Sequence, residues 1–140
     1  MALLAPLFLL LLLAVFEYGA MFFVNLSMQH AVREGARYAI TGQTDLDKNV
    51  DDPARYRAVI EKIKQSSMGL YDSVHPVISV NGTRYGSSAS YSNSMFGGSG
   101  DVIVLQLDCA WPVVTPLLRP FFTAGTYRFS VATTMRNEAF

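Results

Sequence analysis

The hydrophobic pattern of the chain is strongest at its start, where residues 1–24 are almost entirely apolar and carry one charged side chain, Glu17. A bilayer core needs about 20 helical residues, so this segment is long enough to cross a membrane. Its eight leucines each favour insertion by about 0.3–0.6 kcal/mol, and one acidic side chain within the span costs about 3 kcal/mol. A cleaved signal peptide would have a shorter apolar region and a basic start. We therefore expect a retained transmembrane anchor over residues 1–24.

The apolar span continues without a proline into residues 25–41, which predict a soluble continuation of the same helix that ends near Gly42. Ala31, Gly35 and Ala39 recur every four residues on one side, and small residues at this spacing let another helix or a sheet approach closely. Arg33 and Arg37 project elsewhere and are candidate partner contacts. By the positive-inside tendency alone, these two arginines would lie in the cytoplasm.

Residues 42–140 are enough for one small domain, and their periodicity predicts a mixture of helix and strand. Helical spacing of apolar residues predicts a second helix over 53–67, with Asp52 as its N-cap and Pro53 at its first position. Alternating apolar residues predict strands at 74–80, 83–85, 102–111 and 127–135, and Asn81-Gly82 is typical of a tight hairpin turn between the first two. Pro76 indicates that the first of these strands is an edge strand or starts late. The expected fold class is α+β: a long N-terminal helix, one additional helix and a small antiparallel sheet.

Two loops remain open to more than one interpretation. Residues 86–100 are rich in serine and glycine and contain Tyr91 and Phe96; the segment is either a tolerant mobile loop or a contact surface, so both aromatic residues are candidate partner contacts. Residues 111–122 contain three prolines, which exclude a regular helix or a central strand. The leucines and phenylalanines of this second loop are expected to cover the core, lie on the membrane surface or meet a neighbouring molecule.

Composition and charge narrow the function classes. The formal net charge is zero, so nothing favours nucleic acid as a partner. The single cysteine, Cys109, excludes an internal disulfide and a cysteine-based zinc cluster, and it is expected to be buried. No nucleophile elbow, P-loop or histidine pair at zinc-ligand spacing is present in the sequence. We therefore expect no enzymatic activity, no cofactor and no small-molecule substrate.

Two further groups of residues are candidates for function. Glu17 is an acid inside an apolar span, where it either meets a polar group of a neighbouring helix or lies at the membrane interface without a specific role. Asp45, Asp47 and Asn49 alternate like the start of a calcium loop, which makes them weak candidate metal ligands. Glycine and glutamate are absent from the sixth and twelfth positions of that loop pattern, where Val50 and Tyr56 stand.

Specific residues resemble the TadE-like family of bacterial tight-adherence pilus systems. They are the opening Ala2-Leu-Leu-Ala-Pro6 with its leucine run, Phe16-Glu17-Tyr18-Gly19, the segment 29–39, and the ending 135–140. The resemblance covers residues 1–39 and the last six. Members carry a basic leader and a processed glycine upstream of the matching region; neither precedes Met1, which leaves a late start or an unprocessed chain as alternatives. Ala20 also stands where an arginine is frequent.

The resemblance implies a pilin-like, non-catalytic pseudopilin in the bacterial inner membrane, with residues 42–140 in the periplasm. It implies a role in assembly of a tight-adherence (Tad/Flp) pilus, with adhesion and secretion as related functions. The expected partners are other pilins, pseudopilins and pilus assembly proteins, met through helix packing at Glu17, Gly19, Ala31, Gly35 and Ala39. This orientation overrides the one from Arg33 and Arg37. The alternative is a membrane-tethered periplasmic module that binds a ligand or calcium.

Overall fold

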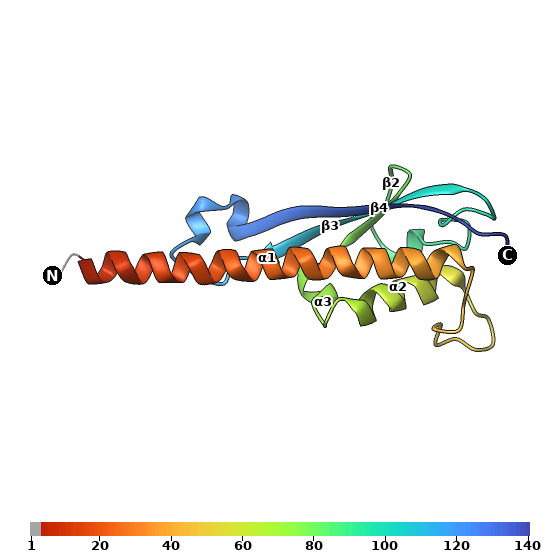
Figure 1. Ribbon diagram of the computed structural model, residues 1–140, viewed down its shortest axis with the longest axis horizontal. Coiled ribbons are helices and arrows are strands. Elements are labelled where there is room, and N and C mark those ends of the chain that lie inside the picture. The colour runs from red at the N-terminus through yellow and green to blue at the C-terminus, as the bar shows by residue number, and fades with distance from the viewer. Residues whose placement is uncertain (1–3) are drawn as a thin grey trace.

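The computed structural model describes residues 4–140 and is dominated by one helix, α1 (Leu4–Ile40), which runs without interruption through both the apolar span and the expected soluble continuation. Residues 1–3 of the predicted anchor lie outside the described residues. The helix ends as predicted: Gly42 has a positive φ of 68°, a conformation that glycine adopts without strain. One rod of 37 residues, about 55 Å long at 1.5 Å per residue, therefore forms the axis of the molecule (Figure 1).

A second helix, α2 (Arg55–Ser66), contacts the C-terminal half of α1. It begins two residues later than predicted, and neither Asp52 nor Pro53 has the expected role. Ala54 occupies the N-cap position, and its N–H donates to Asp47 Oδ2 at 2.7 Å. A carboxylate from the preceding loop thus holds the N-cap residue, and α2 has no side-chain cap hydrogen bond. The chain then forms a one-turn helix, α3 (Tyr71–Val74), which was not predicted and which includes Val74, the first residue of the strand predicted over 74–80.

The four strands form one antiparallel sheet in the order β2-β1-β3-β4, which confirms the predicted α+β class. Their bounds are Val77–Val80 for β1, Thr83–Tyr85 for β2, Val102–Pro112 for β3 and Thr126–Arg136 for β4. Asn81 and Gly82 both have positive φ, as a tight hairpin turn between β1 and β2 requires. β1 starts directly after Pro76, so the late start was the correct interpretation, and β1 lies inside the sheet.

The hydrophobic core lies between α1, α2 and one face of the sheet. The predicted alternation of β3 holds, because Ile103, Leu105, Leu107 and Cys109 are buried while Val102 and Val104 are exposed. In β4, Val131 and Met135 face the same core. In the view of Figure 1 the strands are drawn above α1, and α2 and α3 below it. The C-terminal half of α1 is thus the spine of the domain.

The β3–β4 hairpin extends beyond this core toward the N-terminal end of α1 (Figure 1). The strands remain paired as far as Pro112 and Thr126, and residues 113–125 between them form the hairpin end. This segment contains two short 3-10 turns, Arg119–Phe121 and Thr123–Gly125. The hairpin therefore places a proline-rich loop beside the apolar half of the long helix.

Candidate functional site

The long helix has two kinds of surface, and the boundary between them is the first functional feature of the molecule. From Leu4 to Phe16 the helix has no buried residue, and most of its leucines and phenylalanines are exposed. From Glu17 onward one side of the helix is buried against the protein itself, beginning with Glu17, Met21 and Val24. Within the described residues, α1 is the one helix long and apolar enough to cross a membrane. The length and the apolar surface of its exposed first half fit the hydrocarbon core of a bilayer.

Glu17 stands at this boundary and is joined to the hairpin end. Its side chain is buried, with 4% of the residue surface exposed. The Val114 N–H donates to Oε1 at 3.0 Å, and the Thr115 N–H and hydroxyl donate to Oε2 at 2.9 and 2.7 Å. Three donors satisfy the carboxylate within the chain, which offsets the cost of burying it. This contact was not predicted from the sequence. The signal for it was Thr115, which is, with Arg119, one of two polar residues in the loop 113–122.

Apolar packing surrounds the Glu17 hydrogen bonds. Met21 of α1 packs with Val113 and Leu118 of the hairpin end in a small hydrophobic cluster, separate from the main core. Of the alternatives left open for the leucines and phenylalanines of this loop, core cover is correct for Leu118, which is buried, and for Phe122, which packs partly buried against the same cluster. It is not correct for Leu117 and Phe121, which are 61% and 81% exposed, and Val114 beside them is 64% exposed. The hairpin end thus has one side on α1 and one apolar side that the described chain leaves uncovered.

The small-residue stripe of α1 serves packing inside this chain. Ala31, Gly35 and Ala39 are buried. A Cβ atom at Gly35 would lie 2.3 Å from Ile63 Cγ1 of α2, so the close approach of the two helices requires glycine. Because the domain itself covers these three residues, they are not available at the surface to a second subunit.

Other predicted contact residues of α1 do lie at the surface. Gly19 is exposed, and no atom lies within 4 Å of the position that its Cβ would take. Arg33 and Arg37 are also exposed, and Arg37 has a weak ion pair with Glu34 at 3.8 Å. These three positions remain open to a neighbouring helix or protein.

A buried arginine, Arg55, binds the C-terminal end of α1, a role that was not predicted from the sequence. Arg55 donates from Nε and Nη2 to Ala39 O at 3.0 and 2.6 Å, from Nη1 to Gly97 O at 2.7 Å, and from Nη2 to Asn137 Oδ1 at 3.0 Å. The last turn of a helix carries unpaired carbonyls and partial negative charge, which favour a cation there. Burial lowers the pKa of Arg55 from its usual value. Nothing in the local sequence distinguishes Arg55 from a surface arginine, because its partners come from three distant segments.

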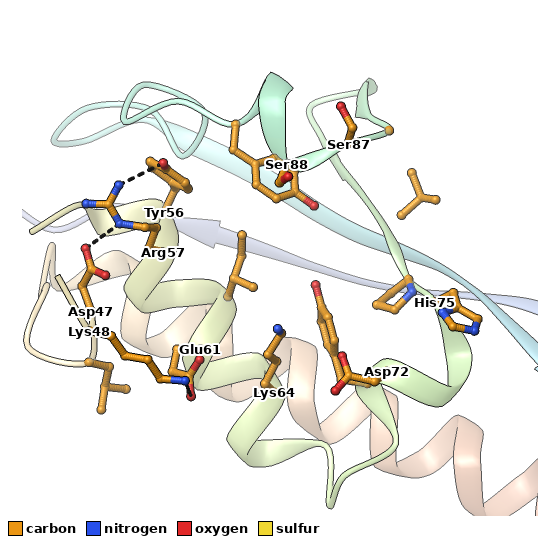
Figure 2. Close-up of a pocket in the computed structure, with 17 residues that line it drawn as sticks. Asp47, Lys48, Tyr56, Arg57, Glu61, Lys64, Asp72, His75, Ser87 and Ser88 are labelled. Carbon is orange, nitrogen blue, oxygen red and sulfur yellow. Dashed lines mark hydrogen bonds and ion pairs between the residues drawn. The ribbon is translucent and has the colours of Figure 1, made fainter.

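A groove of about 660 Å³ lies between α2, α3 and the segment 86–91 (Figure 2). Its charged groups pair with one another: Arg57 donates to Asp47 Oδ2 at 2.8 Å and to the Tyr56 hydroxyl at 3.1 Å, and Lys48 lies 3.5 Å from Glu61. Lys64 lies over the ring of Tyr71, 5.2 Å from its centroid. These cations are already engaged within the chain, so the groove presents a largely self-neutralised surface.

The predicted calcium-like loop is organised by protein groups. Asp47 accepts the N–H groups of Ala54 and Asn49 as well as Arg57, and these hydrogen bonds, the one from Ala54 first, hold its pKa below the usual range. Asp45 instead accepts the hydroxyl of Tyr38 at 2.5 Å. Asp45, Asp47 and Asn49 therefore do not converge on a common point. Within residues 4–140, no group of three or more acidic, histidine or cysteine side chains could hold a metal ion.

Aromatic residues of the segment 86–100 pack against the rest of the protein, which the composition of the segment did not indicate. Phe96 is fully buried in the main core, so its assignment as a partner contact is wrong. Tyr91 is half-buried in the groove, where its ring packs at 6.2 Å from Tyr56 and 6.4 Å from Tyr85. Cys109 is buried as predicted, and burial raises its pKa to about 12, so the thiol is protonated at neutral pH.

The features most directly suited to a function in a membrane are thus on α1: the exposed apolar half, Glu17 at its boundary, and the open surface at Gly19. Comparison with known proteins bears on the same element. No curated protein and no solved structure matches the chain. Residues 1–37, which include the apolar span and Glu17, match the family model described as TadE-like protein, and this match confirms the resemblance inferred from the sequence.

Proposed function

We propose that this chain is a membrane-anchored, pilin-like structural component of a tight-adherence (Tad/Flp) pilus assembly machinery. The observation that carries the proposal is the single unbroken helix, with an apolar half that the fold leaves uncovered and a second half that forms the spine of an α+β domain. The TadE-like match falls on this same helix. In this proposal the protein is a pseudopilin without catalytic activity.

The proposed location is the bacterial inner membrane, with one span and the domain 42–140 in the periplasm. The exposed leucines and phenylalanines before Glu17 support the span. A fusion of alkaline phosphatase after Phe140 tests the orientation, because this enzyme folds to its active form only outside the cytoplasm. Active fusions are expected; inactive fusions that fractionate with the membrane would reverse the proposed topology.

The proposed partners are other pilins, pseudopilins and assembly proteins, which would pack on the exposed side of α1. Deletion of the coding region, followed by counting of surface pili, tests the function; undiminished piliation would overturn it. Complementation with Gly19→Leu then tests the helix contact, because the open space at Gly19 lets the chain itself accept the larger residue. We expect fewer pili with Gly19→Leu than with the control Gly19→Ala, which adds only a methyl group at the same open position.

A second candidate function is a membrane-tethered module that binds a ligand in the groove of Figure 2. The groove volume and the ring of Tyr91 favour it, whereas the mutual pairing of the groove's charges does not. Calorimetric titration of the detergent-solubilised chain with calcium tests the calcium-binding form of this alternative, and stoichiometric heat would favour it. Lost piliation in the deletion strain favours the structural component.

A further inference from the structure

We propose that residues 113–122 of the hairpin end are a second membrane-contacting element, which lies in the interfacial layer of the bilayer that α1 enters. The proposal rests on the membrane anchoring proposed above and adds a contact that the anchor alone does not require. Three features support it: the position of the hairpin end along α1, its exposed apolar side chains, and the hydrogen bonds of its backbone.

The hydrogen bonds of Val114 and Thr115 to Glu17 fix the position of the hairpin end along α1. Glu17 precedes Val24, the end of the apolar span, by seven residues, which is about 10 Å along a helix. The interfacial layer of a bilayer is about 5–10 Å deep, so when residues 17–24 cross this layer the hairpin end lies at its inner edge. The β3–β4 hairpin can move away from the membrane only if its three hydrogen bonds to the buried Glu17 carboxylate break.

The surface of the hairpin end suits this environment. Val114, Leu117 and Phe121 are exposed at the level where α1 itself exposes Tyr18 and Phe22. Transfer of such side chains out of water is worth about 1.5–3 kcal/mol each when complete. The one charged residue of this loop, Arg119, keeps its side chain at the surface while its Nε donates to Val113 O at 3.1 Å. An exposed arginine beside apolar residues is suited to lipid phosphate groups at the interface.

Most backbone N–H groups of residues 113–122 are either absent or hydrogen-bonded within the chain, which suits a poorly solvated layer. Prolines 112, 116 and 120 have no N–H group to satisfy. The N–H groups of Val113, Leu118, Phe121 and Phe122 donate to backbone carbonyls of the same hairpin end, and those of Val114 and Thr115 donate to Glu17. An irregular segment inside the hydrocarbon core would leave too many polar groups unpaired, so the interfacial layer is the depth that fits.

Depth-dependent fluorescence quenching tests the proposal on the full chain in vesicles of phosphatidylcholine and phosphatidylglycerol. A Cys109→Ala background receives one new cysteine for an environment-sensitive dye, at Leu117 in the hairpin end, at Phe8 in the anchor or at Val50 in an exposed loop near the far end of α1. The phosphatidylcholine carries bromine either near the glycerol end of its acyl chains or near their methyl end. We expect loss of fluorescence at position 117 with the first lipid, stronger loss at position 8 with the second, and no loss at position 50.

The outcomes separate the two proposals. Quenching at position 8 without quenching at position 117 would leave the anchor intact and overturn the hairpin contact. A blue-shifted but unquenched dye at position 117 would also overturn it, because this result indicates a protein neighbour, such as a second copy of the chain. Lack of quenching at position 8 would overturn the membrane anchor and the hairpin contact together.

Discussion

The carboxylate of Glu17 accepts hydrogen bonds from both the N–H group and the hydroxyl of Thr115, a residue 98 positions later in the chain. This contact joins the middle of the apolar helix to the end of the longest hairpin. It turns an acidic side chain that is costly in an apolar span into the attachment point of a loop. Each donor is a neutral group, and together they leave no need for a buried cation.

Removal of this attachment should release the hairpin end. In Glu17→Ala, two N–H groups and one hydroxyl lose their acceptor, and charge-assisted hydrogen bonds of this kind contribute about 1.5–3 kcal/mol each. We expect faster amide hydrogen exchange across residues 113–122 of the detergent-solubilised chain, with the main core little affected. The control Glu34→Ala removes only a weak surface pair with Arg37. Equal exchange in the two variants would contradict the role of Glu17.

The contact between α1 and α2 should tolerate no side chain at Gly35. In Gly35→Ala the new methyl group would lie 2.3 Å from Ile63 Cγ1, so the two helices must separate or Ile63 must leave its rotamer. Overpacking of this kind costs about 1–3 kcal/mol. We expect a lower thermal midpoint by circular dichroism. The matched change Gly19→Ala meets open space and should not lower the midpoint; equal losses in both variants would refute the packing argument.

Arg55 should be the most sensitive polar residue of the domain. Arg55→Ala leaves Gly97 O and Asn137 Oδ1 without the arginine donor, and it leaves Ala39 O with only the hydrogen bond from the Gly42 N–H at 3.2 Å; each buried acceptor that becomes unpaired costs about 1–3 kcal/mol. Arg55→Lys should recover part of the loss, because an ammonium group cannot reach all three acceptors in one geometry. Chemical unfolding followed by near-ultraviolet circular dichroism measures both. A fully stable Arg55→Ala variant would contradict this account.

Asp47 should make the stability of the domain depend on acid. Its folded-state pKa lies below the unfolded value, chiefly because of the hydrogen bond from the Ala54 N–H. Its contribution is therefore complete above the unfolded pKa and is lost as the pH falls through the folded pKa. We expect a smaller drop in thermal midpoint on acidification for Asp47→Asn than for the wild type. Asp51→Asn, at an exposed position in the same loop, should retain the wild-type dependence.

Cys109 should be chemically silent in the folded chain. Burial raises its pKa to about 12, so very little thiolate exists at neutral pH, and the side chain is 3% exposed. We expect no reaction with a thiol-specific disulfide reagent at pH 8 until denaturant is added. Rapid labelling of the native protein would show that the sheet opens at β3.

Much of the fold was predictable because its signals are local. The apolar span and the absence of proline after Pro6 predicted α1, period-two alternation predicted β3 and β4 to within a residue at each end, and Asn81-Gly82 predicted the hairpin turn. Each of these depends on residues close together in sequence, whose spacing matches one backbone geometry.

The functional contacts were harder to predict because their partners lie far apart in the chain. Asp52 was the expected cap for α2, but the helix starts at Arg55, and Asp47, seven residues before Ala54, accepts the N–H of this N-cap residue. Phe96 lies in a serine- and glycine-rich loop whose composition indicates exposure, yet the tertiary fold buries it completely. Glu17 and Arg55 acquire their roles only when distant loops dock on α1.

The attachment of the domain at both ends of its spine has a mechanical consequence. At one end, Glu17 holds the hairpin; at the other end, the Arg55 guanidinium and the Glu138 N–H donate to the terminal carbonyls Ala39 O and Ile40 O. Because α1 and the sheet are joined at both of these points, we expect the sheet to turn or tilt together with α1. In the proposed membrane-anchored chain, the orientation of α1 in the bilayer would thereby set the direction in which the sheet faces.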